Sequence, residues 1–97
     1  MARVKSSIPP GLWQKFLMRV AVIVYNNEPI YYKDLVKEVE YNRYIREDYG
    51  LVGTIKRTEV YKAIHDLVTW GVIDIDDNGM VRTTSLLDEF IKRGGTF

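Results

Sequence analysis

Residues 54–84 change from a helical to a strand-like pattern within one short stretch, and this limits the fold more than any other feature of the chain. In residues 54–70, Val60, Ile64 and Leu67 recur at the spacing of one face of an α-helix. This apolar face should turn inward, because exposing it to water is unfavourable. We therefore predict a helix over residues 54–70 that packs on a core.

The ends and the outer face of this helix also follow from its sequence. A hydroxyl of Thr54 or Thr58 can cap the start, because it accepts hydrogen bonds from N–H groups that lack a partner inside the helix. Gly71 marks the end, since glycine tolerates the left-handed conformation that follows many helices. The outer face consists of cations, hydroxyls and rings: Lys56, Arg57, Thr58, Tyr61, Lys62, His65 and Thr69.

The second half of the stretch reads as a β-hairpin whose register depends on the length of its turn. A two-residue turn would place Ile75 opposite Arg82, which mixes core and solvent on one face. A three-residue loop over residues 77–79, with the glycine left-handed, pairs Ile75 with Val81 and Asp74 with Arg82. We predict the second register, in which Asp74 and Arg82 lie side by side on the outer face.

The residue pattern across helix and hairpin resembles the recognition helix and first wing strand of winged helix-turn-helix domains, as in small transcription regulators of the MarR, PadR and ArsR kind. The resemblance extends over residues 10–93, and its specific positions are Thr58, Val60, Tyr61, Ala63, Ile64, Leu67, Gly71, Val72 and Ile73. It implies a mostly helical α+β fold: a winged helix, with a three-helix core, a β-hairpin wing and a C-terminal helix. It also implies that the 54–70 helix lies in the DNA major groove, with the wing along the neighbouring backbone or minor groove.

The N-terminal part of the chain predicts an arm followed by an unusually apolar helix. We divide the chain into a flexible basic arm, residues 1–9, which could touch phosphate or stay solvated, and a winged-helix domain, residues 10–97. The first helix, residues 10–26, is apolar on more than one face, which is typical of a helix that is packed on two sides. In so short a chain, we expect a second subunit to cover one of those sides.

The segment after the first helix predicts a short strand and a second helix. Ile30 and Tyr31 should pair with the wing strands, as the resemblance implies. A helix over residues 33–41 should turn three apolar side chains inward: Leu35, Val36 and Val39.

Residues 42–53 form an insertion where helix-turn-helix motifs have a turn of about three or four residues. The insertion extends the second helix or forms an ordered loop, and the sequence does not decide between them. It could contact DNA through Arg43 and Arg46 or a partner through its tyrosines, although packing within the domain is the more common role of such tyrosines.

The C-terminal segment predicts a last helix with Ser85 as its cap. Its large apolar residues share one face: Leu86, Leu87, Phe90 and Ile91. In the regulators that this chain resembles, terminal helices often form the dimer interface. We therefore expect a homodimer through the first and last helices.

Composition excludes several classes of protein. With 46% hydrophobic and 28% charged residues in 97, the chain is expected to form one ordinary folded domain. It has no cysteine, which excludes disulfides and thiolate metal sites and fits a reducing, cytoplasmic location. Its only histidine excludes a multi-histidine metal centre, and no catalytic constellation or cofactor motif is present. We expect no enzyme, no cofactor and no membrane span.

Charge gives mixed support to DNA binding. The net charge is only +1, whereas DNA-binding domains are usually strongly basic. The first 27 residues carry four cations and no acid, so the N-terminal end is the basic one. The hairpin carries one cation, Arg82, beside Asp74, Asp76 and Asp77, and an acidic hairpin opposes contact with phosphates.

These observations lead to a sequence-specific double-stranded DNA-binding protein, a homodimeric transcription regulator, as the first hypothesis. Its candidate DNA-binding residues are Lys56, Arg57, Thr58, Tyr61, Lys62, His65 and Arg82. The alternative is a winged-helix adaptor that binds protein, through its acidic hairpin or its tyrosine-rich insertion, because winged helices also serve as interaction modules.

Overall fold

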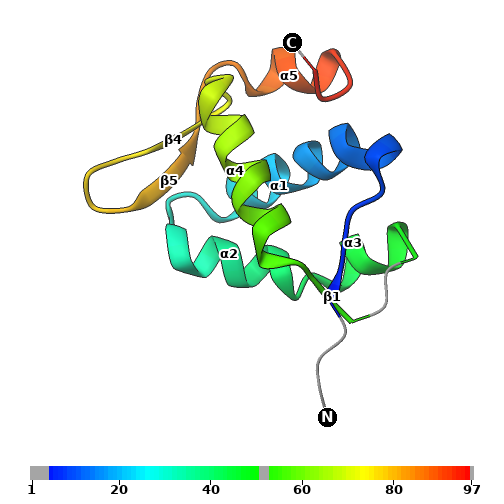
Figure 1. Ribbon diagram of the computed structural model, residues 1–97. Coiled ribbons are helices and arrows are strands. Elements are labelled where there is room, and N and C mark those ends of the chain that lie inside the picture. Colours follow the sequence, from blue (N-terminus) through cyan, green and yellow to red (C-terminus); the bar gives the residue numbers. More distant parts are fainter. Residues whose placement is uncertain (1–4, 51–52, 97) are drawn as a thin grey trace.

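A computed structural model describes residues 5–50 and 53–96 as a mostly helical α+β fold (Figure 1). Three helices form its centre, and a three-stranded antiparallel sheet projects to one side of them. The central helices are α1 (Trp13–Asn27), α2 (Tyr32–Glu40) and α4 (Arg57–Thr69). The sheet has the order β2 (Ile30–Tyr31), β5 (Met80–Thr83) and β4 (Ile73–Ile75).

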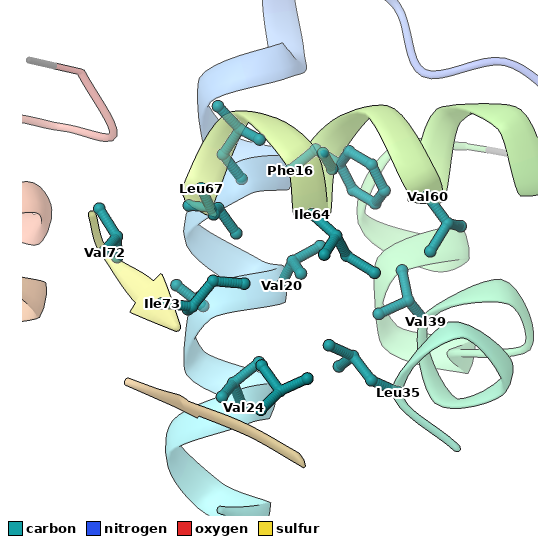
Figure 2. Packing of buried hydrophobic residues seen from close by; sticks show 14 of the residues in the cluster. Phe16, Val20, Val24, Leu35, Val39, Val60, Ile64, Leu67, Val72 and Ile73 are labelled. Carbon is teal, nitrogen blue, oxygen red and sulfur yellow. The ribbon is translucent and has the colours of Figure 1, made fainter. Parts of the chain in front are cut away.

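The core lies where α1, α2, α4 and the sheet meet (Figure 2). Phe16 and Val20 of α1 face Ile64 and Leu67 of α4, and α2 closes the side with Leu35. Replacing a fully buried leucine such as Leu67 by alanine typically costs about 2–5 kcal/mol. The apolar stripe predicted for residues 54–70 is confirmed as the buried side of α4, and the predicted inward residues of α2 are also buried: Leu35, Val36 and Val39.

The first helix begins with a 3₁₀ turn, Pro10–Leu12, and continues as α1 to Asn27. One side is fully buried: Phe16, Leu17, Val20, Ala21 and Val24. On the opposite side Val22 is 37% and Tyr25 59% exposed. The two-sided apolar character predicted from the sequence is therefore present, with one side covered by the chain itself.

The predicted hairpin register is confirmed. Ile75 pairs with Val81 and Asp74 with Arg82 in the antiparallel ladder, and Gly79 has a positive φ of 79°. The predicted strand is also present, because Ile30 pairs with Val81 of the central strand β5. The side chain of Arg82, however, forms its ion pair with Asp76 and not with Asp74 across the ladder.

The start of α4 differs from the prediction. The helix begins at Arg57, three residues after the predicted start, and the cap position Lys56 makes no side-chain cap, so neither Thr54 nor Thr58 caps it. Residues Thr54–Ile55 form strand β3, which pairs in parallel with β1 (Lys5–Ser6). Both residues of β3 are buried, so extended pairing with the N-terminal segment replaces the first helical turn.

The segment before Pro10 packs against the rest of the domain. Besides the pairing of Lys5 and Ser6 with β3, Ile8 is 5% exposed and belongs to the core cluster. The predicted arm, residues 1–9, thus contains residues that are part of the folded unit. Arg3, its other cation, lies outside the described residues.

The insertion contains a separate helix, α3 (Arg43–Asp48). Asn42 has an extended backbone conformation and separates α3 from α2. It also caps α3, because its Oδ1 accepts a hydrogen bond from the N–H of Ile45 at 2.9 Å. Ile45 is 1% exposed and joins the core. The segment therefore neither prolongs α2 nor forms only a loop.

The last helix, α5 (Leu87–Lys92), is shorter than predicted and is not capped by Ser85. The hydroxyl of Thr84 accepts from the N–H of Leu86 at 3.2 Å and donates to the carbonyl of Gly71. Leu87 and Phe90 are buried, while Leu86 and Ile91 are 43% and 38% exposed. The four apolar residues predicted to share one face are thus split between the core and the surface.

The described residues form no helix that is both long enough and apolar enough to cross a membrane.

Candidate nucleic-acid interface

The outer face of α4 is largely exposed to solvent. All seven residues predicted to lie there are exposed: Lys56, Arg57, Thr58, Tyr61, Lys62, His65 and Thr69. They are exposed because Val60, Ile64 and Leu67 fix the orientation of the helix by packing its other side into the core. The face therefore presents ammonium, guanidinium, hydroxyl and imidazole groups to solvent.

The cations of this face do not form one cluster. Arg57 and Lys62 are five positions apart, which separates them by about 140° around the helix axis. Arg57 lines a hollow between α4 and α2, whereas Lys62 lines another with Trp13 and Glu59. The predicted contacts thus fall on two edges, and Thr58, Tyr61 and His65 lie between them.

Arg57 forms an ion pair with a buried carboxylate. Its Nε and Nη2 both lie 3.1 Å from Oε2 of Glu40, the last residue of α2. Glu40 is 2% exposed, and the side chain of Arg57 is 52% exposed. A buried carboxylate is costly unless it is paired, so this contact compensates Glu40 and fixes Arg57 at the edge of α2.

The hollow between α2 and α4 has a volume of about 210 Å³ and combines cations with aromatic rings. Its lining residues are Tyr32, Lys33, Val36, Lys37, Arg57 and Tyr61. The rings of Tyr32 and Tyr61 stack with centroids 6.0 Å apart and planes inclined by 15°. Burial raises the pKa of the Tyr32 phenol, and the neighbouring Tyr61 phenol raises it further.

Lys33 and Lys37 are interface candidates that the sequence reading did not include. They lie one helical turn apart on α2, and both line the hollow on the side of α4. Glu38 instead lines a different hollow, with residues of α1 and α3. The sequence signal for this pair is the four-residue spacing of two lysines beside the inward Val36. That signal can be used only when it is known which edge of α2 packs against α4.

Lys62 lies on the more acidic edge of α4. Its Nζ is 5.1 Å from the ring centroid of Trp13, a cation–π geometry, and Glu59 lies in the same hollow. The indole Nε1 of Trp13 donates to Oδ2 of Asp66 at 3.1 Å. Trp13 therefore packs against α4 and contacts two charged groups there.

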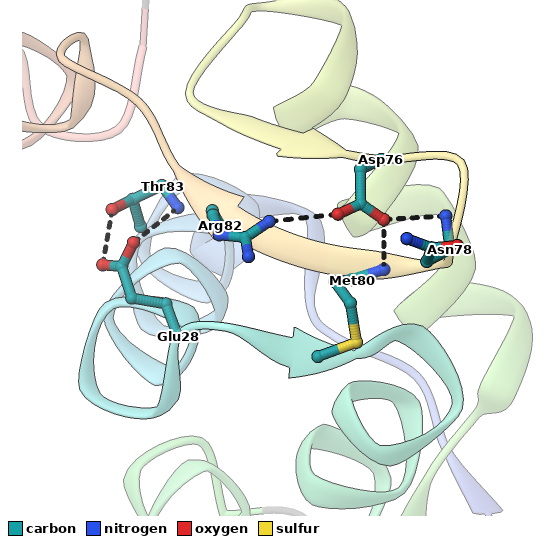
Figure 3. Close-up of polar contacts among 6 residues, drawn as sticks. All are labelled: Glu28, Asp76, Asn78, Met80, Arg82 and Thr83. Carbon is teal, nitrogen blue, oxygen red and sulfur yellow. Dashed lines mark hydrogen bonds and ion pairs between the residues drawn. The ribbon is translucent and has the colours of Figure 1, made fainter.

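The only cation of the hairpin, Arg82, is paired with Asp76 of the same hairpin (Figure 3). Asp76 Oδ1 accepts from the N–H of Asn78 at 2.8 Å and of Met80 at 3.0 Å, and Oδ2 accepts from Nη1 of Arg82 at 3.1 Å. The backbone hydrogen bond from Met80 is the largest cause of a lowered Asp76 pKa, followed by that from Asn78 and by Arg82. Asp74 and Asp77 stay exposed, so the hairpin presents negative charge.

The cations of the insertion are also engaged. Arg43 pairs with Glu47 at 2.8 Å, and Nη1 of Arg46 donates to the carbonyl of Gly53 at 3.1 Å. Tyr44 is 71% exposed, whereas Tyr49 packs on the core. Burial raises the pKa of Tyr49.

Comparisons with protein-family models, curated proteins and solved structures gave no match for this chain. Within residues 5–50 and 53–96, no three His, Asp or Glu side chains gather as a metal-binding group.

Proposed function

We propose that this chain is a winged-helix protein that binds double-stranded DNA without catalysis and acts as a homodimeric transcription regulator. Three central helices followed by the β4–β5 hairpin support a winged helix, with α4 as recognition helix and the hairpin as wing. In this proposal α4 enters the major groove and reads sequence through Thr58, Tyr61 and His65. Lys56, Lys62 and Arg57 contact phosphates.

The observation that carries the proposal is the exposed outer face of α4, together with the two lysines of α2 beside it. A helix of 13 residues is about 20 Å long and, with side chains, fits a major groove about 12 Å wide. Lysines on a neighbouring helix contact the flanking backbone in such an arrangement, and phosphate contacts supply most of the affinity.

The proposed homodimer uses the surface of α1 and α5 that the chain leaves uncovered. Val22 and Tyr25 of α1 and Ile91 of α5 are exposed apolar side chains, which support an interface there. A two-fold dimer would place its two α4 helices about 34 Å apart, so that they enter successive major grooves on one side of the duplex.

Fluorescence anisotropy with labelled random-sequence duplex, titrated against salt, tests the proposal. We expect binding that weakens steeply from 50 to 200 mM salt, with a log–log slope whose magnitude is about 0.9 per phosphate contacted. Selection of duplexes from a random pool should then enrich one two-fold symmetric sequence. Absence of duplex binding at 50 mM salt would contradict the proposal.

A second function has its own support in the acidic hairpin. Because Arg82 is held by Asp76, the hairpin presents Asp74 and Asp77 without a free cation. Such a surface suits a basic protein partner better than DNA, as in an adaptor subunit. Retention on heparin separates the two, since an adaptor of this kind would pass through at low salt.

A further inference from the structure

Glu40 has no role in the proposed function. It is the last residue of α2, it is 2% exposed, and the contact found for its carboxylate is Arg57. A methionine or leucine would fill the same place without the cost of burying a charge. A buried acid next to a proposed DNA-binding face also repels phosphate, so its presence there calls for a physical reason.

The geometry of the Glu40–Arg57 contact supplies one. Both Nε and Nη2 of Arg57 are directed to the same oxygen, Oε2, each at 3.1 Å. A guanidinium is planar and has five N–H groups, so fixing this edge leaves the opposite edge oriented and available. The side chain of Arg57 is 52% exposed in spite of its pairing with a buried carboxylate.

Arg57 lines a hollow that two further cations also line. Lys33 and Lys37 line the α2 side, and Tyr61 and Val36 complete the wall. Within the described residues neither lysine forms an ion pair. Three cations around about 210 Å³ favour a compact anion with several acceptor oxygens, and a tetrahedral phosphate group is of that kind.

We propose that the hollow between α2 and α4 holds one phosphate group, contacted by Lys33, Lys37 and Arg57, and that Glu40 is a positioning residue that orients Arg57 toward it. The proposal rests on the proposed function for the source of the phosphate, which is the backbone of the DNA bound by α4. A free phosphorylated small molecule offers the same chemistry, and the experiment separates the two sources.

Substitution of Glu40 tests the proposal, because a pure charge effect and a positioning role predict opposite changes in duplex affinity. If Glu40 contributes only negative charge, Glu40→Gln and Glu40→Leu both strengthen duplex binding. If it positions Arg57, binding weakens in spite of the lost repulsion, about threefold for Gln, which keeps an acceptor, and about tenfold for Leu, which has none. Glu38→Gln removes the same charge from the other flank of α2 and should strengthen binding slightly.

A double-mutant cycle shows whether Glu40 acts through Arg57. Lysine keeps the charge of Arg57 but cannot hold the same fork geometry, so in an Arg57→Lys background Glu40→Leu should no longer weaken binding and should show only the slight gain from the lost negative charge. Equal effects of Glu40→Leu in both backgrounds would overturn the positioning role. Thermal unfolding of each variant identifies any that fails to fold, and Glu40→Gln then serves as the isosteric replacement.

Titration of the whole chain with inorganic phosphate at constant ionic strength, followed by ¹H–¹⁵N correlation spectra, tests the site without DNA. We expect saturable shifts at Lys33, Lys37, Arg57 and Tyr61 that disappear in Lys33→Gln/Lys37→Gln. Shifts spread over unrelated lysines such as Lys15 and Lys92, or no shifts, would overturn the phosphate site.

The two proposals fail in different ways. Phosphate shifts in the hollow without any duplex affinity would remove the proposed function and leave a site for a phosphorylated small molecule. Duplex affinity that is unchanged by Lys33→Gln/Lys37→Gln and increased by Glu40→Leu would keep the proposed function and remove the phosphate site.

Discussion

The α4 face and the β4–β5 hairpin both carry cations, but they differ in what neutralises them. Lys56, the residue just before α4, is exposed, and Arg57, the first residue of α4, is oriented by a carboxylate that is itself buried. On the hairpin, Arg82 is held by the exposed carboxylate of Asp76, between two further exposed acids. The number of cations in a region is therefore a weaker guide to polyanion binding than the charge that remains after internal pairing.

The difference also separates two uses of an ion pair. The Asp76–Arg82 pair belongs to a network that shapes the hairpin turn, since Asp76 also accepts two backbone N–H groups. Exposed pairs of this kind contribute little to stability, because water screens the two charges. The Glu40–Arg57 pair instead fixes the direction of one guanidinium edge, which makes it the better candidate for a binding function.

The largest expected effect comes from reversing charge on α4. Lys56→Glu combined with Lys62→Glu should weaken duplex affinity about 100-fold at 100 mM salt and reduce the salt slope by about two, because two phosphate contacts are lost and replaced by repulsion. Anisotropy titration measures both quantities.

The matched control makes the same change of charge in the hairpin and α5. Arg82→Glu with Lys92→Glu should weaken duplex affinity less than about fivefold, as expected for charge far from the contact. Similar losses in the two double variants would remove the distinction between α4 and the hairpin.

The next effect concerns the α2 lysines. Lys33→Gln with Lys37→Gln should weaken duplex binding about tenfold and make the salt slope shallower by about two, with little change in the ranking of preferred sequences, since phosphate contacts carry no sequence information. Lys15→Gln with Lys92→Gln is the control of equal charge. A changed sequence preference in the first variant would mean that these lysines read bases.

A smaller effect is expected when a cation is added to the hairpin. Asp77→Lys raises the local charge by two, and if the hairpin stays away from DNA, affinity should rise less than about threefold. A rise in affinity of about tenfold or more in the same anisotropy assay would place the hairpin against the DNA backbone. The proposed winged-helix interface would then include the hairpin as well as α4.

The smallest effect is on stability and follows from Asp76. Its lowered pKa means that the carboxylate stabilises the fold above the pKa of the unfolded chain, and that this contribution is lost as the pH falls through the titration range. Asp76→Asn should therefore lower the urea midpoint at pH 7, and the gap to the wild type should narrow between about pH 5 and pH 2. A gap that is constant with pH would assign the effect to the shape of the side chain alone.

Sequence periodicity predicted the elements that depend on local pattern. The hairpin register followed from keeping Ile75 and Val81 on one face, and the buried side of α4 followed from its helical spacing. Both are determined by the side chains of one segment, so no knowledge of distant contacts was needed.

The elements that were missed depend on partners far away in the chain. Thr54 and Ile55 form a strand because the N-terminal segment lies beside them. Ser85 does not cap α5, and the hydroxyl that accepts from the N–H of Leu86 is that of Thr84, which also bonds to Gly71. Such tertiary contacts override local capping preferences.

The sequence predicted only the part of the candidate site that lies on α4. The exposed residues of α4 followed from its own periodicity, and they are where the sequence placed them. Lys33, Lys37 and Glu40 could not be assigned, because their relation to Arg57 exists only once α2 packs on α4. The pairing of Arg82 with Asp76, six residues away, was not visible in the cross-strand register, and the contact of Arg82 with DNA stays a prediction.

Mapping the duplex on the protein by ¹H–¹⁵N correlation spectra tests the central claim most directly. With a selected duplex, we predict the largest amide shifts at the outer positions of α4, from Lys56 to His65, and at Lys33 and Lys37, with small shifts over residues 74–82. Large shifts confined to residues 74–82, with α4 unchanged, would contradict the account.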